Sequence, residues 1–149
     1  MFARFLIGSI VATVMFTSSA SFAVAEVIVI VNKQNAVESL SRKEVKRRFL
    51  RTASTWGNGT KVYPVDMAVD SPERKQFLTE VLGMSAAQLK RYWIARQYAT
   101  AETPPPTVRT DSSAIEMVES TTGGIGFISR DALKRYGNAN VKVVFSLSN

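Results

Sequence analysis

Residues 27–31 read Val-Ile-Val-Ile-Val, an unbroken run of β-branched side chains. Branching at Cβ restricts side-chain rotation and favours an extended backbone over a helix. Because successive side chains of a strand point to opposite faces, a run without polar residues needs apolar partners on both faces. The run therefore predicts a strand inside a sheet that helices cover, which is the layering of an α/β domain.

Helix-start signals recur after this strand. A Ser followed three residues later by Glu or Gln forms a capping box, and two such pairs, Ser41 with Glu44 and Ser85 with Gln88, precede amphipathic segments. Ser71 before Pro72 and Ser113 before Glu116 are typical of further helix starts. We expect helices over about 42–50, from 72 to the residue before Gly83, from 86 past Trp93, over 113–119 and over 130–136, the last closed by Gly137.

Strands are expected over 61–65, after an Asn58-Gly59 turn, over 125–129 and over 141–145. Three prolines at 104–106 exclude a helix there and predict an exposed loop. Helices and strands thus alternate along 26–149, with no internal repeat. We predict one α/β domain in which helices cover a small mixed sheet.

The first 25 residues have the order of a secretory signal peptide. Arg4 precedes an apolar stretch over 5–16, which is too short to span a bilayer, and Ala23-Val24-Ala25 offers a cleavage site after Ala25. Small residues also permit cleavage after Ala23. We expect export to the periplasm, with 26–149 as the mature domain and without stable membrane insertion.

The net charge of the domain limits the classes of partner that we expect it to bind. Nineteen Lys and Arg against twelve Asp and Glu give the chain a net charge of +7, and loss of Arg4 with the signal peptide leaves +6. A basic surface suits anionic lipid, acidic glycans or small anions, or simply keeps a domain soluble. Export argues against nucleic acid as a partner.

Several kinds of chemistry are missing from the sequence. The chain contains no histidine and no cysteine, so it lacks the commonest general base, the commonest metal ligands and a thiol nucleophile. The carboxylates form no recognisable acid-base pair, and Ser-x-x-Lys does not occur, although a Ser–Lys hydrolase with distant partners stays open. We predict a protein without catalytic residues, metal or cofactor.

The glycines of the segment "STTGGIGFIS", residues 120–129, do not form a phosphate loop. Such a loop follows a strand and opens a helix, whereas this segment follows a predicted helix and opens a strand. The end of a helix carries the negative pole of its dipole, which disfavours phosphate. We expect Gly123 or Gly124 to be the left-handed residue that ends the helix, and Gly126 to permit close packing.

Three segments occur in the order and spacing of one known family. The stretches "SLSRKEVKRRFLRTASTWGNGTKVYPV", "KRYWIARQYATAETPPP" and "STTGGIGFI" resemble those of the phosphate-binding periplasmic proteins of ABC importers. The resemblance covers about 26–130. It implies the fold of one lobe of these two-lobed binding proteins, and phosphate or another small oxyanion as the ligand. It also implies the membrane subunit of an ABC importer as a partner.

The ligand residues implied by the resemblance are altered in this sequence. The family pattern is an Arg, three residues, then Ser-Gly-Thr at a helix start; alignment on Phe77 places Met67 at the Arg and Ser71-Pro72-Glu73 at the triplet. Only Ser71 matches, and Pro72 has no N–H to donate. The resemblance therefore leaves Ser71, with Arg74 nearby, as the ligand residues, while Ser71 also reads as a helix cap and Arg74 as a solvated surface residue.

A second interpretation is a protein–protein adaptor of the cell envelope that has kept the lobe and lost the anion. Its binding surface would be a run of basic residues on and after the first predicted helix, or the Pro104-Pro105-Pro106 loop, against an acidic partner. The same run also suits a solvated helix face. The residues are Arg42, Lys43, Lys46, Arg47, Arg48 and Arg51.

Overall fold

A four-stranded mixed sheet forms the centre of the computed structural model, which describes residues 25–137 and 139–147. The strand order is β2-β5-β1-β6, in which β5 and β6 run antiparallel to β1 and β2 runs parallel to β5. The bounds are β1 Val27–Asn32, β2 Tyr63–Pro64, β5 Gly124–Ser129 and β6 Val141–Ser146. The predicted signal peptide lies outside the described residues, apart from Ala25.

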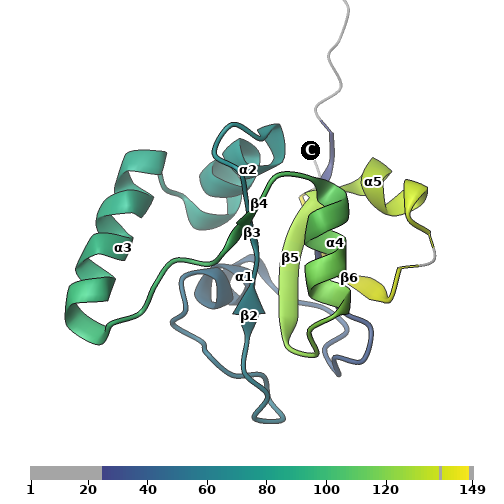
Figure 1. Cartoon of the computed structure of the whole chain (residues 1–149), viewed down its shortest axis with the longest axis horizontal. Helices are drawn as coiled ribbons and strands as arrows, with labels where there is room; N and C mark the ends of the chain where they lie inside the picture. The colour runs from purple at the N-terminus through teal and green to yellow at the C-terminus, as the bar shows by residue number, and fades with distance from the viewer. Residues whose placement is uncertain (1–24, 138, 148–149) are drawn as a thin grey trace, which may run out of the picture.

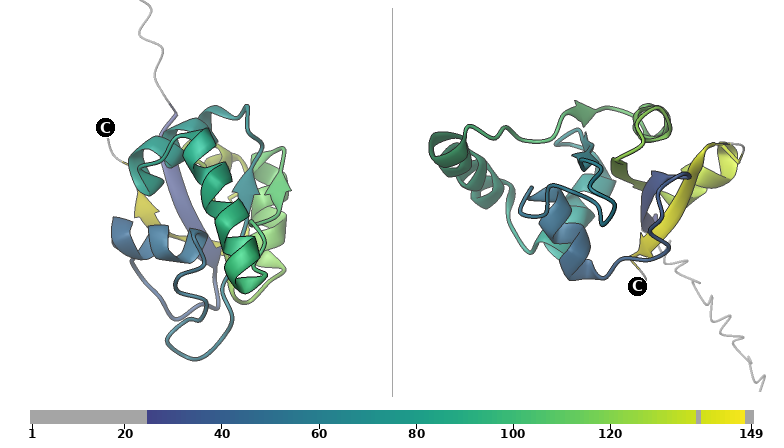
Figure 2. Two further views of the ribbon diagram at one scale, coloured as in Figure 1. Left: turned by 90° about the vertical axis from the view of Figure 1, so that its left-hand side faces the viewer. Right: turned by 90° about the horizontal axis from the view of Figure 1, so that it is seen from below.

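Helices lie on both faces of this sheet (Figures 1 and 2). Phe127 of β5 packs against Phe77 and Phe49 on one face, with ring centroids 4.1 and 5.7 Å away. Its neighbour Gly126 points to the other face, against Val118. The helices are α1 Arg42–Phe49, α2 Pro72–Phe77 continued by the π-helical turn η1 Leu78–Leu82, α3 Ala86–Thr100, α4 Asp111–Glu119 and α5 Arg130–Arg135.

The β-branched run lies where the sequence predicts. All six residues of β1 are buried, and β1 is hydrogen-bonded on both edges. The capping boxes at Ser41 and Ser85 are present, Ser71 caps α2, and Gly83 ends η1 with a left-handed backbone. The α/β class, with a small mixed sheet covered by helices, is confirmed.

A second, two-stranded parallel sheet stands beside the first. It pairs β3, Asp66–Met67, with β4, Thr107–Val108. Beyond it α3 projects from the body of the molecule (Figure 1), and of its fifteen residues only Leu89 and Trp93 are buried. In the part of the chain that the structure describes, no helix has the length and apolar composition needed to cross a membrane.

Some element boundaries differ from the sequence prediction. The expected strand 61–65 is replaced by β2 and β3, because the backbone leaves one sheet at Pro64 and joins the other at Asp66. Thr110 rather than Ser113 caps α4; its side chain accepts the backbone N–H of Ser113. The helix α5 ends at Tyr136 and not at a left-handed Gly137.

Two of the glycines after α4, Gly123 and Gly124, serve a different purpose from the one expected, whereas Gly126 packs closely against Val118 as predicted. Positive φ angles occur at Gly59 and Gly83, and neither Gly123 nor Gly124 is left-handed. A Cβ at residue 123 would lie 1.8 Å from the carbonyl oxygen of Lys61, and one at Gly124 would lie 3.0 Å from Cα of Val118. Glycine is needed here because two backbone segments touch, and not because the chain turns left-handed.

This distinction is testable by substitution. Asn is tolerated where a helix ends in the left-handed region, but no side chain fits where the Cβ itself meets a backbone oxygen. We expect both Gly123→Ala and Gly123→Asn to lower the free energy of unfolding by at least about 3 kcal/mol, as measured by urea denaturation.

The matched control is Gly57→Ala, because a Cβ at residue 57 has no neighbour within 4 Å. We expect that variant to unfold within about 0.5 kcal/mol of the parent. A stable Gly123→Asn protein would restore the helix-cap interpretation.

Candidate functional site

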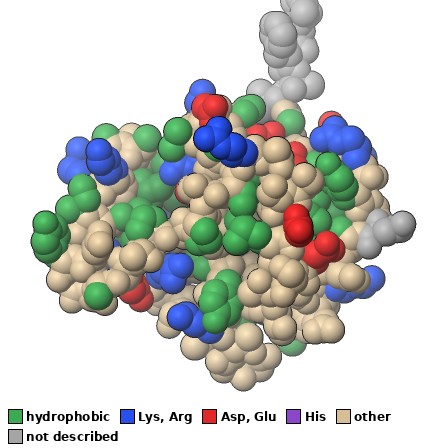
Figure 3. All heavy atoms as spheres, viewed as in Figure 1, with side chains coloured by type: hydrophobic (Ala, Val, Ile, Leu, Met, Phe, Trp, Pro, Cys, Tyr) green, Lys and Arg blue, Asp and Glu red, His purple; other side chains and the backbone are tan. Residues whose placement is uncertain are grey.

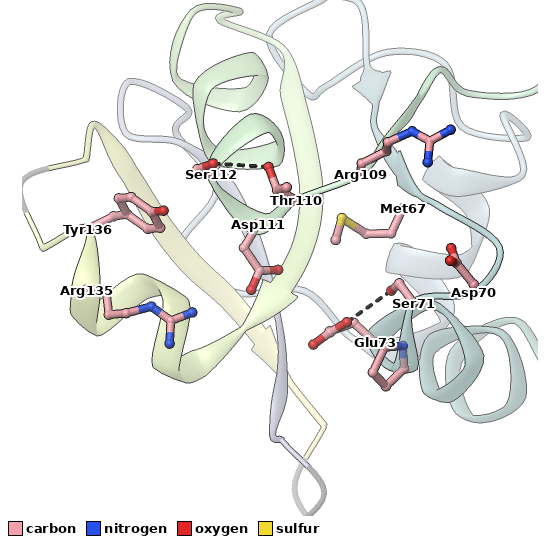
Figure 4. A pocket seen from close by; sticks show the side chains of 11 residues that line it. Met67, Asp70, Ser71, Glu73, Arg109, Thr110, Asp111, Ser112, Arg135 and Tyr136 are labelled. Carbon is pink, nitrogen blue, oxygen red and sulfur yellow. Dashed lines mark hydrogen bonds between the residues drawn. The ribbon is translucent and has the colours of Figure 1, made fainter.

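A hollow of about 500 Å³ opens where α2 and α4 begin (Figure 4). The parallel pairing of β3 with β4 causes this arrangement, because each of these strands is followed within a few residues by a helix. The two helix starts therefore lie side by side at the carboxyl edge of the small sheet, the edge at which α/β folds commonly bind ligands. The C-terminal part of α5 closes the third side.

Ser71 is the predicted ligand residue that the structure places in the hollow. Its Oγ accepts the backbone N–H of Arg74 at 3.0 Å and donates to Oε2 of Glu73 at 3.0 Å. The hydroxyl thus satisfies the helix end as a cap should, and the negative charge of Glu73 lies in the first turn. An anion at this helix start would compete with the carboxylate for Ser71.

Arg74 does not reach the hollow. Its side chain is buried, and its Nε lies 3.1 Å from both carboxylate oxygens of Asp66. It lines the apolar groove beside α3 instead. The interpretation of Arg74 as a solvated surface residue is wrong, because the side chain folds back over β3 to a carboxylate.

The Asp66–Arg74 ion pair is largely buried. Burial raises the pKa of Asp66 above its ordinary value, and the charge and hydrogen bond of Arg74 oppose that rise. The two side chains expose 16% and 10% of their surface, so solvent screens the pair only weakly. The pair links β3 to α2 and so fixes how the first helix start faces the hollow.

The second helix start contributes hydroxyl groups and a carboxylate that the sequence analysis missed. Thr110 Oγ1 lies 3.1 Å from Oγ of Ser112 and 2.9 Å from Oγ of Ser113. Asp111 accepts a 2.8 Å hydrogen bond from Ser129, the cap of α5, and so joins the starts of α4 and α5. The available signal was the pair Thr110-Asp111, which follows the three prolines after a gap of three residues and precedes Ala114, the first buried residue of the helix.

Charges of both signs surround the hollow. Arg109 and Arg135 stand on opposite sides of it in Figure 4, and Met67 points into the space between Thr110 and Ser71. Against the two guanidinium groups are three carboxylates, those of Asp70, Glu73 and Asp111. The arrangement offers hydrogen-bond donors and acceptors to a small polar solute, without a net positive field.

The basic residues of α1 are not part of this hollow. Arg42 lies over the ring of Phe145 at 5.9 Å and Arg48 over Trp56 at 4.6 Å, whereas Lys43 and Arg47 are exposed.

Within residues 25–137 and 139–147, no cluster of three or more Asp and Glu residues has the geometry of a metal site.

Comparison with solved structures bears out the fold. The chain superposes with a TM-score of 0.62 on an ABC-type phosphate transport receptor from Vibrio cholerae, at 20% identity over 83% of this chain and 47% of that one. A structure described as a phosphate ABC transporter substrate-binding protein with bound phosphate, from Clostridium perfringens, matches with the same score at 19% identity, over 81% and 45% of the two chains.

PstS from Borrelia burgdorferi matches with a TM-score of 0.62 at 11% identity, over 80% of this chain and 47% of its own. The chain therefore spans about half the length of the solved structures that it matches. No protein-family model matches the sequence, and the search of curated proteins found no match.

The Asp66–Arg74 pair gives a pH-dependent prediction. Arg74→Met leaves a buried carboxylate without its partner, and we expect it to lower the free energy of unfolding by about 3 kcal/mol at neutral pH. Because the folded-state pKa of Asp66 then lies above the unfolded value, the folded protein binds the proton more tightly. The loss should shrink as the pH falls through the raised folded-state pKa of Asp66.

Urea denaturation at neutral and mildly acidic pH measures both effects. The control is Lys134→Met, which breaks the exposed pair with Asp131 and should change the free energy of unfolding by less than about 1 kcal/mol. If the loss of stability in Arg74→Met does not shrink at acidic pH, the Asp66 carboxylate is not the group whose burial causes that loss.

Proposed function

We propose that this chain is a non-catalytic, periplasmic solute-binding domain and that its ligand, a small oxyanion, occupies the hollow between α2 and α4. The observation that carries the proposal is the meeting of two capped helix starts at the carboxyl edge of β3 and β4. Backbone N–H groups at a helix start attract anions. The pattern of the first 25 residues supports a periplasmic location.

Phosphate is the oxyanion that we propose, on the basis of the resemblance. A hollow lined by carboxylates repels a fully ionised anion but can accept a hydrogen bond from one that keeps a proton. Phosphate keeps a proton at neutral pH and sulfate does not. The three carboxylates at the hollow therefore favour phosphate over sulfate.

Ser71 is the proposed contact from α2. Arg74 reaches a ligand only by leaving Asp66, so Arg109 and Arg135 are the guanidinium groups that the hollow itself offers. By resemblance, a facing lobe or a second subunit would complete the ligand shell, and the membrane subunit of an ABC importer would receive the solute.

The competing proposal is an envelope adaptor that has lost the anion. The observation in its favour is that Met67 stands where the resemblance leads us to expect an Arg, while Asp70 and Glu73 add negative charge at the same helix start. The adaptor would bind an acidic protein through α1. Its binding would weaken in high salt and on charge reversal of Arg47 and Arg48.

The test of phosphate binding is calorimetry and the thermal midpoint of residues 26–149, titrated with phosphate and separately with sulfate at constant ionic strength. A ligand at a hundred times its dissociation constant adds about 2.7 kcal/mol, which shifts the midpoint by several degrees. We expect a saturable shift with phosphate and a much smaller one with sulfate.

Two matched serine variants locate the site. Ser71→Gly and Ser85→Gly each remove the hydroxyl that caps a helix, but only Ser71 lines the hollow. Glycine is a tolerable cap and costs a few tenths of a kcal/mol. We expect Ser71→Gly to weaken phosphate binding about tenfold or more and Ser85→Gly to leave it unchanged. If millimolar phosphate leaves the thermal midpoint unchanged, phosphate binding is rejected and the adaptor is favoured.

A further inference from the structure

A second, smaller hollow lies at the C-terminal end of α1. Its volume is about 230 Å³, and its walls come from the end of α1, the segment 53–62 and the residues that follow α3. None of its lining residues belongs to the hollow between α2 and α4. In Figure 3, basic side chains gather at the lower edge of the molecule, between the end of α3 and the loop after α1.

Positive charge dominates this pocket. Arg48, Arg51 and Lys61 line it, and the carboxylate of Glu102 is the single acidic group among its lining residues. Glu102 already accepts a 2.6 Å hydrogen bond from Nη2 of Arg96. Among the described residues, neither Arg48 nor Arg51 is ion-paired with a carboxylate.

The two guanidinium groups are also partly removed from water. Arg48 stacks over Trp56, 4.6 Å from its ring centroid, and Nε of both Arg48 and Arg51 is buried without a hydrogen-bond partner. Burial lowers the pKa of Arg48; the charge of Glu44 opposes that effect and the charge of Arg47 adds to it. Desolvated cations without a counter-ion are costly, and a bound anion would relieve that cost.

The end of α1 does not cancel this positive field. A helix C-terminus normally presents free carbonyl oxygens, which repel anions. Here the carbonyl of Arg47 accepts from Thr52 and Ala53, and that of Leu50 accepts from the hydroxyl of Tyr92. The carbonyl of Arg51 accepts from Arg96. Because these oxygens are engaged, the guanidinium groups determine which ligand the pocket attracts.

We propose that this pocket binds a small anion with two charged oxygen groups, through Arg48 and Arg51. Guanidinium groups hold phosphate and carboxylate oxygens in paired hydrogen bonds. The three cations and one carboxylate of the lining leave an excess of two positive charges, which a doubly charged anion balances. The proposal does not depend on phosphate binding between α2 and α4.

Calorimetric titration of residues 26–149 with pyrophosphate and with malonate tests the proposal, at a constant ionic strength of about 0.15 M. Pyrophosphate and malonate distinguish a pocket that binds a diphosphate from one that binds a dicarboxylate of similar size. We expect at least one of them to bind, and expect Arg51→Gln and Arg48→Gln each to weaken that binding at least about tenfold. Arg51→Gln leaves the stacking of Arg48 on Trp56 in place, so it tests the pocket even if Arg48→Gln unfolds.

Arg47→Gln is the matched control, because it removes the same charge from the exposed face of α1 without touching the pocket. It should change the affinity by less than about twofold, since solvent and salt screen its charge. Equal affinity in Arg47→Gln and Arg51→Gln, or no binding of either anion at millimolar concentration, would overturn the proposal. Loss of binding in Ser71→Gly would place the anion between α2 and α4 and would overturn the proposal as well.

Discussion

The burial of β1 on both faces is the constraint on which the rest of the structure depends. Each of its six side chains is withdrawn from water, so the sheet must be covered twice. The helices α1 and α2 meet that requirement through Phe49 and Phe77, and α4 meets it on the opposite face through Val118. Burial of a branched aliphatic side chain contributes about 1.5–3 kcal/mol, so the run supplies a large share of the apolar stabilisation of the domain.

This layering also determines where ligands can bind. Two helices that begin beside each other, after parallel strands, present their N-terminal ends to one hollow. The Asp66–Arg74 pair fixes one of these ends to β3, and the Asp111–Ser129 hydrogen bond fixes the other to the start of α5. Polar contacts therefore hold the two helix starts in place, while the buried side chain of Met67 gives the hollow an apolar floor.

Features that depend on neighbours within about four residues could be predicted from the sequence. The capping boxes at Ser41 and Ser85 and the Ser71 cap are local hydrogen bonds, and each is present. Features that depend on distant partners could not. The strands β3 and β4 have two residues each and exist only because they pair across some forty residues of chain. The contact of Gly123 with Lys61, and the return of Arg74 to Asp66, are likewise invisible to periodicity.

The positions of the charges distinguish the two proposed binding surfaces of this domain. At the hollow between α2 and α4, three carboxylates face two guanidinium groups, so the proposed affinity for phosphate would come from hydrogen bonds and from a proton that the ligand carries. At the end of α1, unpaired and partly desolvated arginines supply electrostatic attraction without such selectivity. Because salt weakens charge–charge attraction but hardly affects neutral hydrogen bonds, the salt dependence of ligand binding would help to indicate which proposed surface holds the ligand.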